Sequence, residues 1–309
     1  MGYLTKYGAF WGLIPVTVGR IHWVSPADSY YIEGRAYSAS DNNDGLSPER
    51  ALRTVAQAMS NAIASANETI ALLPGDHTTT ASIAWSKAGI TMTGIQGGTV
   101  NPSSPRTTLT TSATDEVINV TAPGGEFSNI CLIPVTTQIG LDISGAAIGF
   151  HMHDFSIDVF TPAVSSSTIG VSTNGSTFRV LIERFYAEAD GGQGNVIVAS
   201  GCRNMTISNG RIHHTAGTWG STILCGAASS GLLIENCNWV SYASGTPLTV
   251  GVNGTGATIT NGVEVRNCLF GQNVTTPVDN FGAGLCTLVN NYKAGVGATD
   301  GGTLITVIT

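Results

Sequence analysis

A short pattern of apolar and polar residues recurs along the second half of the chain. Each copy has two apolar residues two positions apart, then a turn-forming polar residue, then an apolar residue three positions later. The three clearest copies are Met205-x-Ile207-x-Asn209-x-x-Ile212, Leu232-x-Ile234-x-Asn236-x-x-Trp239 and Val263-x-Val265-x-Asn267-x-x-Phe270. Residues two apart in a strand share one face, so each copy predicts a short strand with an inward-facing apolar side, followed by a bend. The three-and-four spacing of an amphipathic helix is absent from these copies.

Weaker copies extend the pattern upstream and downstream. They read Phe127-x-Asn129-x-x-Leu132, Phe150-x-Met152-x-Asp154-x-x-Ile157 and Val180-x-Ile182-x-Arg184-x-x-Ala187, and a last copy near Asn290 and Asn291 has an ambiguous register. Successive bend positions lie 24 to 31 residues apart. A period of this length predicts a solenoid.

The bend residues predict how the coils stack. Asn and Asp tolerate left-handed backbone angles better than other non-glycine residues, so we expect one bend to repeat above another. The expected structural ladder consists of Asn129, Asn209, Asn236 and Asn267. Cys237 and Cys268 follow the bend in consecutive copies, which places them as neighbours in an interior column.

An amphipathic helix is predicted over residues 48–66, ahead of the first coils. Ser47 suits the N-cap, Pro48 the first helical position and Glu49 the positive end of the helix dipole. Apolar residues at 51, 52, 55, 58, 59, 62 and 63 form one face, which would protect the open end of a solenoid. The preceding Asp41-Asn-Asn-Asp44-Gly45 is similar to part of a calcium loop. Leu52 stands where such a loop needs Glu, so a tight turn is favoured and no metal site is expected.

These features together resemble a known family. The entry segment Tyr37-Ser-Ala-Ser-Asp41-Asn-Asn-Asp44-Gly45-Leu-Ser47-Pro48-Glu49-Arg-Ala-Leu-Arg-Thr54 is similar to the stretch that opens many pectate-lyase-like proteins, including bacteriophage virion and tail proteins. Residues 69–75 and 90–94 resemble the first coils of the same fold. The resemblance covers roughly residues 37 to 300, and it specifies a fold more strongly than an activity because this superfamily carries many functions.

The expected architecture is therefore all-β. It is a right-handed single-stranded parallel β-helix with an N-terminal capping α-helix and an extended N-terminal arm. We divide the chain into an arm over residues 1–36, an entry segment and capping helix over residues 37–68, and the β-helix over residues 69–309.

The composition of the chain argues against several classes of binding partner. Charged residues make up 11% of the chain, and a net charge of −7 with 13 basic residues provides no basic stripe, so we expect no nucleic acid partner. The six cysteines show no zinc spacing, and we expect buried free thiols and no cofactor. No apolar run reaches the roughly 20 residues of a membrane span. Pro15 interrupts the apolar run near the N-terminus and no convincing cleavage site follows, so no signal peptide is expected.

The first 36 residues are unusually aromatic, with seven of the chain's 22 aromatic residues. Such side chains need a surface to bury against. The arm either folds back along its own solenoid or docks on another subunit, and both can hold, because Tyr and Trp are favoured interface anchors. The expected partner-binding residues are Tyr3, Tyr7, Phe10, Trp11 and Trp23.

Three clusters of polar residues are candidates for a catalytic site. The first contains His151, His153, Asp154 and Asp158; the second Glu183, Glu188 and Asp190, with Glu235 two coils away; the third Arg203, Arg211, His213 and His214. None reproduces the Asn-Thr-Asp, Asp-Asp and Gly-His-Gly elements of polygalacturonase-like hydrolases or the Arg-x-Pro-x-x-Arg element of pectate lyases. We interpret each cluster as solvated surface and expect no catalytic residues.

Two functions from different classes follow. The favoured one is a structural bacteriophage virion protein, a capsid decoration (cement) or spike protein attached through its N-terminal arm to a capsid shell or tail. We expect a homotrimer that is assembled in the host cytoplasm. Head decoration is favoured over a tail fibre because the chain leaves no room for a separate receptor-binding domain after the solenoid. The alternative is a tailspike-type or bacterial polysaccharide depolymerase, and a surface glycan is a further candidate ligand.

Overall fold

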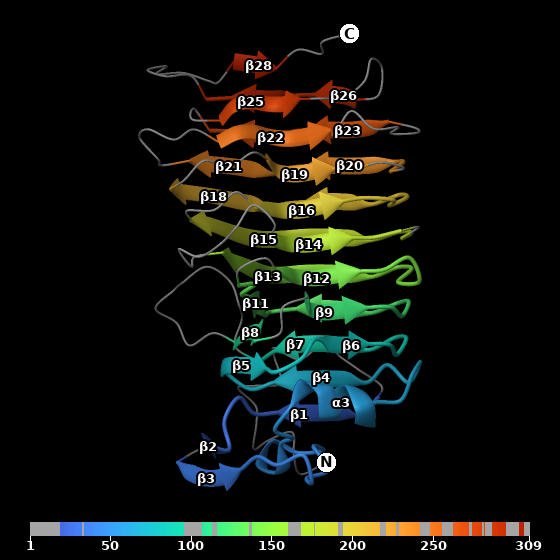
Figure 1. Ribbon diagram of the computed structural model, residues 1–309, viewed down its shortest axis with the longest axis vertical. Helices are drawn as coiled ribbons and strands as arrows, with labels where there is room; N and C mark the ends of the chain where they lie inside the picture. Colours follow the sequence, from blue (N-terminus) through green and yellow to red (C-terminus); the bar gives the residue numbers. More distant parts are fainter. Residues whose placement is uncertain are drawn as a thin grey trace.

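The computed structural model describes residues 19–32, 34–95, 107–112, 116–135, 138–159, 168–175, 177–190, 194–216, 221–226, 229–241, 248–254, 262–271, 274–279, 281, 286–294 and 303–305. They form a right-handed parallel β-helix, an elongated stack of coils that runs from the N-terminal to the C-terminal end (Figure 1). We name its three sides faces 1, 2 and 3, in the order in which the chain passes through each coil.

Face 1 begins each coil and is continuous with face 2 around a bend. Its strands are β1 (Ile21–Val24), β4 (Thr69–Leu72), β7 (Thr91–Gly94), β10 (Glu126–Ser128), the first parts of β13 (His151–Val159) and β15 (Leu181–Asp190), β17 (Thr206–Ser208), β20 (Leu232–Glu235), β23 (Val263–Arg266) and β26 (Cys286–Val289).

Face 2 follows the bend. Its strands are β5 (Gly75–Thr79), β8 (Thr107–Thr111), β11 (Cys131–Leu132), the second parts of β13 and β15, β18 (Arg211–Ala216), β21 (Asn238–Ser241), β24 (Leu269–Phe270) and β27 (Asn291–Lys293). The short strand β28 (Thr303–Ile305) pairs antiparallel with β27 at the C-terminal end.

Face 3 is a separate sheet of eight parallel strands among the described residues. They are β6 (Ile83–Trp85), β9 (Glu116–Val120), β12 (Ile139–Ile143), β14 (Ile169–Thr173), β16 (Asn195–Ala199), β19 (Ser221–Cys225), β22 (Leu248–Gly254) and β25 (Val274–Asp279). An antiparallel hairpin, β2 (Ser29–Ile32) and β3 (Arg35–Ser38), lies outside the stack.

The register places equivalent residues of the repeat directly above one another. Ile207 is paired with Ile234, and Ile234 with Val265, each in consecutive parallel strands of face 1. All three side chains are fully buried. The predicted inward column is therefore confirmed, and Glu235, next to Ile234 in the chain, faces outward.

The bend between faces 1 and 2 requires left-handed backbone. Its residues are Asn129, Asp154, Arg184, Asn209, Asn236, Asn267 and Asn290, with φ between 48° and 56°. The N–H of Asn209 donates to the carbonyl of Glu235 (3.1 Å) and the N–H of Asn236 to that of Arg266 (3.1 Å), so each bend is tied to the next coil. The last copy, whose register was ambiguous, has Asn290 at the bend.

A second left-handed bend, between faces 3 and 1, was not predicted. Its residues are Gly89, Gly124, Gly149, Arg179, Asn204, Gly231 and Gly262, all at positive φ. Five of the seven are glycine, which adopts this conformation without steric cost. The N–H of Gly124 donates to the carbonyl of Ile148 (2.8 Å), and the N–H of Gly149 to that of Phe178 (2.9 Å). This bend is therefore linked from coil to coil like the first.

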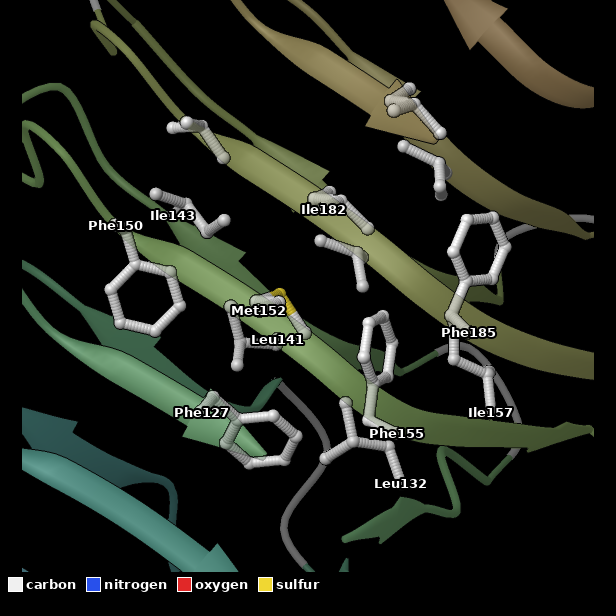
Figure 2. Close-up of a cluster of buried hydrophobic side chains, with 14 of the residues drawn as sticks. Phe127, Leu132, Leu141, Ile143, Phe150, Met152, Phe155, Ile157, Ile182 and Phe185 are labelled. Atoms are coloured by element: carbon white, nitrogen blue, oxygen red, sulfur yellow. The ribbon is translucent and has the colours of Figure 1, made fainter. Parts of the chain in front are cut away.

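The core inside the coils is stratified by residue type. Phe127, Phe155 and Phe185 lie close to one another in three consecutive coils, with ring centroids 6.1 and 5.7 Å apart (Figure 2). The residues that directly follow the first bend in each coil stack in one interior column. In this column Gly210 comes after Phe185, and a larger residue would not fit because a Cβ at position 210 would lie 2.2 Å from the Phe185 ring. Higher in the column, Cys237 and Cys268 are buried free thiols, as predicted.

Asn291 ends this interior column with a polar side chain. It is fully buried, accepts from the Cys268 N–H (2.9 Å) and donates to the Val265 carbonyl (2.7 Å). Both ends of its amide are therefore paired, as a buried polar group requires. Asn290 makes the bend and Asn291 seals the column, although both are the same residue type.

The N-terminal boundary differs from the predicted one. Strand β1 lies within the predicted arm of residues 1–36, yet it pairs in parallel with β4 as the first rung of face 1. The carbonyl of Gly45 and the backbone of Leu52 hydrogen-bond its other edge. A four-residue strand before a hairpin carries no copy of the 27-residue pattern, so periodicity could not reveal it.

The predicted helix over residues 48–66 is also wrong in its extent. The chain forms a 3-10 turn at Pro48–Arg50, an extended segment, and then α3 (Val55–Asn61). The extended segment lets Leu52 bridge to Val24, while Asp41 Oδ1 accepts from the N–H groups of Arg53 (3.0 Å) and Thr54 (2.9 Å). Thr54 is the true N-cap, and its hydroxyl accepts from the Gln57 N–H (3.1 Å). No helix in the described part of the chain is long and apolar enough to cross a membrane.

We expect adjacent residues of β20 to differ sharply in their effect on stability. Ile234→Asp places a carboxylate in the dry interior and should cost several kcal/mol, whereas Glu235→Ala removes a surface ion pair and should cost about 0.5 kcal/mol or less. Urea unfolding of the two variants measures both values. Equal midpoints would show that the inside and outside assignments are wrong.

Candidate functional site

The outward side of face 1 carries the main polar cluster. Glu126, His151, His153 and Glu183 alternate with the inward residues Phe127, Met152 and Ile182 on three consecutive coils. The alternation of a strand therefore brings all four to the surface. The prediction that His151 and His153 point outward agrees with their side-chain exposures of 34% and 16%.

Each histidine of this cluster bonds to a carboxylate on a neighbouring coil. His151 Nε2 lies 3.1 Å from Glu183 Oε1, one coil toward the C-terminus. His153 Nε2 lies 3.0 Å from Glu126 Oε1, one coil toward the N-terminus. The two imidazole rings are 4.6 Å apart between their centroids. The histidines therefore link three coils through their side chains.

The bend next to this cluster is charged where other coils have Asn. Arg184 donates to both oxygens of Asp154, with Nε to Oδ1 and Nη2 to Oδ2 distances of 2.9 Å, and also bonds Glu183. Asp154 Oδ2 in turn lies 2.7 Å from His153 Nδ1. The cluster is a closed network in which each carboxylate has a cationic or imidazole partner.

These contacts shift the titration of the cluster. The hydrogen bond from His153 lowers the pKa of Glu126, and the same bond raises the pKa of His153. The Arg184 guanidinium lowers the pKa of Asp154. The carboxylates are held ionised, which suits ion pairing and not proton donation at neutral pH.

A second group lies on face 2, beyond the bend. Tyr186 Oη is 3.1 Å from His213 Nδ1, and the same nitrogen is 3.5 Å from Glu188 Oε1. Burial, with the neighbouring Glu188 charge, raises the pKa of Tyr186 to about 12. Arg211 is paired with Tyr186 in the register of β15 and β18. The sequence prediction places Glu188 and His213 in different clusters. It does not include Tyr186, because Tyr186 matches no position of the repeat.

The remaining members of the predicted clusters do not come together. Ser208 lies between Glu183 and Glu235 in the register, so the two carboxylates are two coils apart, as predicted. Arg266 binds Glu235, with Nη2 2.6 Å from Oε2. Glu235 is therefore neutralised by the next coil.

Arg203 lies apart from the basic residues with which it was grouped. It sits at the turn before β17, whereas Arg211 and His213 follow the bend at the other end of that strand. Asp158 faces outward beside Glu188. The side chains of Asp190 and His214 lie outside the described residues.

Face 3 holds an outward polar group that sequence analysis did not find. The Asn119 amide donates to Glu116 Oε1 (2.8 Å), and the Ser82 hydroxyl donates to the same oxygen (3.2 Å). Asp142 lies on the next coil, paired in register with Asn119 and Ser172. Burial, with the nearby Glu116 charge, raises the pKa of Asp142. A polar residue between two apolar ones, as in Ile118-Asn-Val120 and Leu141-Asp-Ile143, was the available signal.

The predicted partner anchors are only partly visible. Tyr3, Tyr7, Phe10 and Trp11 lie outside the described residues. Trp23 is 3% exposed in β1 and packs with Ala51, Ala71, Leu73 and Ile95, so it is a core residue and the prediction of an interface anchor is wrong for this position.

Beside Trp23, the chain buries an ionisable pair at the first coil. His22 Nε2 lies 2.9 Å from Glu68 Oε2, and both side chains are almost fully buried. Glu68 also accepts from the Ile63 N–H (2.7 Å). Within the described ranges, no group of three or more His, Cys, Asp or Glu residues is placed to hold a metal ion.

The comparisons with known proteins concern the fold. No protein-family model matches the chain, and no curated protein matches it. A rhamnogalacturonan lyase superposes with a TM-score of 0.60 at 14% identity, over 89% of this chain and 74% of the lyase. An alginate lyase from a Paenibacillus species gives 0.58 at 16%, over 77% of this chain and 83% of the lyase.

A pectin methylesterase crystallised with a hexasaccharide gives a TM-score of 0.57 at 12% identity, over 95% of this chain and 94% of the esterase. ORF18 of Geobacillus virus E2 matches at a TM-score of 0.36, which is too low to indicate a shared fold. The structural neighbours are thus pectate-lyase-like parallel β-helix proteins. At these identities the likeness extends to the fold alone.

The network on face 1 predicts a pH-dependent contribution to stability. Because the folded pKa of His153 is raised, its contribution is complete below the unfolded value of about 6.5 and is lost as the pH rises through the folded value. Because the pKa of Glu126 is lowered, its contribution is present above about 4.5 and is lost as the pH falls through the folded value.

We therefore expect His153→Gln to destabilise the protein more at pH 5.5 than at pH 8.5. For a partly exposed pair the difference should be on the order of 0.5 to 1 kcal/mol. Urea unfolding of wild type and variant at the two pH values measures it, with Thr206→Ala on the same face as a control without a titratable group. An equal loss at both pH values would contradict the assigned role of His153.

Proposed function

We propose that this protein is a structural component of a bacteriophage virion, a capsid decoration (cement) or spike protein attached through its N-terminal arm. The observation that carries the proposal is the ion pairing of the outward face. Glu126, Asp154, Glu183 and Glu235 each bond to a histidine or arginine, largely on a neighbouring coil. Such pairing reinforces the stack of coils, and among the described residues of face 1 these four carboxylates are not free to act as a pair in hydrolysis.

The N-terminal segment supports attachment at one end of the rod. The first rung, β1, begins at Ile21, so the aromatic residues Tyr3, Tyr7, Phe10 and Trp11 precede the solenoid in the chain. None of the described strands includes them. The entry segment over residues 37–54 resembles the one that opens bacteriophage virion and tail proteins of this fold. A homotrimer, as expected from the sequence, fits this role.

A depolymerase remains the second candidate, and one observation favours it. Tyr186, Glu188 and His213 form a hydrogen-bonded group beside Arg211 on face 2. In β-elimination on a uronic acid, His213 would take the proton next to the substrate carboxylate, Arg211 would neutralise that carboxylate, and the protonated Tyr186 hydroxyl would donate to the leaving glycosidic oxygen. The Tyr186 hydroxyl is protonated at neutral pH, as a proton donor must be, and its pKa of about 12 is closer to that of the leaving alcohol than the ordinary value of 10.

For the structural role, we expect deletion of residues 1–18 to abolish binding to particles and to leave the fold intact. The deletion removes four aromatic anchors but stops before β1, which the β-helix needs as its first rung. Co-sedimentation with particles that lack this protein measures binding, and circular dichroism checks the fold. Glu188→Gln is the matched control and should bind like wild type. Particle binding that survives the deletion would remove the proposed mechanism.

For the enzymatic alternative, the sensitivity is reversed. Purified protein should then release unsaturated uronates from an acidic host-surface glycan, detected by their absorbance. Tyr186→Phe should reduce that rate by at least 100-fold, because general acid catalysis contributes factors of roughly this size. The arm deletion should leave the rate unchanged. Turnover of this kind would overturn the structural proposal.

A further inference from the structure

The N-terminal end of the solenoid is closed on two of its three faces. On face 1, β4 is covered by β1, whose own outer edge bonds to the backbone of Gly45 and Leu52. On face 3, α3 packs against β6. On face 2, the first strand is β5, and among the described residues it pairs only with β8. One edge of β5 therefore has no described strand beside it.

The free edge of β5 presents specific backbone groups. The Thr79 carbonyl accepts from the Ser112 N–H (2.9 Å), so Thr79 directs its backbone toward β8. The two backbone groups of a strand residue point to the same side, and alternate residues point to opposite sides. Asp76 and Thr78 therefore direct their N–H and carbonyl groups away from β8. Both residues are exposed.

A pocket lies along this edge. Its volume is about 360 Å³, and its lining residues are Arg53, Thr54, Val55, Ala56, His77 and the run from Thr78 to Ser82. One wall is thus β5 and its continuation, and the other is the start of α3. Exposed edge strands are templates for pairing with another chain, and β-branched Thr is typical of strands. The shape and chemistry fit an extended peptide that adds as a strand.

The sequence outside the described structure contains such a peptide. Residues 3–7 read Tyr-Leu-Thr-Lys-Tyr. In an extended strand this sequence would place Tyr3, Thr5 and Tyr7 on one side and Leu4 and Lys6 on the other. Tyr and Thr are enriched in strands. The described chain starts at Gly19, which lies against the backbone of Ala66 and Asn67, in the segment that follows α3. The pocket is lined by the start of this seven-residue helix, whose length is about 10 Å.

The connecting segment is long enough to reach a second copy of the chain. Residues 8–18 can extend to roughly 36–40 Å, three to four times the length of α3. Crossing to a neighbouring molecule makes use of this reach. We propose that residues 3–7 of one copy pair with the free edge of β5 in a second copy. Repeated around a ring, this exchange closes a homo-oligomer.

This inference goes beyond the proposed attachment to a particle, because it names a surface on a second copy of the chain that receives residues 3–7 of the arm. The first test uses a fluorescent peptide of residues 1–18 and the chain that lacks them. The peptide should bind the truncated chain. Thr78→Pro removes the edge-facing N–H while leaving the β8 side intact, and should weaken binding at least tenfold. Thr78→Val keeps the N–H and should bind within about twofold of the parent.

Two further measurements test the proposal even if the Thr78→Pro variant does not fold. If Thr78→Pro does not fold, as judged by circular dichroism, the change is made in the peptide, where Thr5→Pro should abolish binding and Thr5→Val should not. Light scattering should show an oligomer for the full chain and a monomer for the chain without residues 1–18. No peptide binding, or equal binding to the Thr78→Pro variant, would overturn the proposal.

A monomeric full-length chain whose Thr78 amide is protected from hydrogen exchange would also overturn it, because the arm would then fill its own pocket. Particle binding is measured separately with the untruncated Thr78→Pro chain. Loss of oligomers with retained particle binding supports the exchange and leaves attachment standing. Loss of particle binding on deleting residues 1–18, with no peptide binding to β5, leaves attachment standing and overturns the exchange alone.

Discussion

The stacking of left-handed bends is the constraint on which the rest of this molecule depends. A parallel β-helix needs each coil to turn at the same place, because a shift of one residue would exchange the inward and outward faces of a strand. Here the backbone N–H of a bend residue such as Asn209 or Gly124 bonds to the following coil. The register of the bends then places Ile207, Ile234 and Val265 in one dry column.

The departures from Asn in this column connect the fold to its polar surface. Asp154 and Arg184 occupy bend positions at φ of 51° and 48° and form a two-fold hydrogen-bonded ion pair between adjacent coils. Non-glycine residues other than Asn and Asp seldom adopt such angles, so Arg184 carries a backbone cost that its charged contacts help to offset. The bend residues thus anchor the network that includes His153 and Glu183, and the ionised face follows from the geometry of the turn.

The ends of a solenoid pose a different problem from its middle, because the last strand on each face has an unpaired edge. At the N-terminal end the three faces differ: a strand covers face 1 and a short helix covers face 3, whereas a pocket lies open on face 2. An edge with free backbone groups can recognise a strand in any sequence that alternates suitably, and the proposed exchange of arms makes use of this property. In that proposal, the arm and the core of the β-helix are different parts of the chain.

Several features of the fold could be predicted from the sequence alone. The pattern repeats in the coils from residue 127 onward, so the inward column, the first bend from residue 129 onward, the buried thiols Cys237 and Cys268 and the parallel β-helix itself were all accessible. The outward direction of His151 and His153 followed from strand alternation. Residues two to five apart set the inward and outward sides, and the spacing of 24 to 31 residues between copies indicates the stack of coils.

Only the tertiary structure decided the features that join distant segments. Strand β1 becomes the first rung because β4, 48 residues later, supplies its partner. Asp41 binds the backbone N–H groups of Arg53 and Thr54 in extended conformation, so the helix begins only at Val55. The grouping of Tyr186 and Glu188 with His213, and the separation of Arg203 from Arg211, depend on which coils are adjacent and on which side of a bend each residue lies. A repeat shows that equivalent positions stack, but the chemistry of a site depends on neighbours from different coils, and their register is settled only when the backbone hydrogen bonds between coils form.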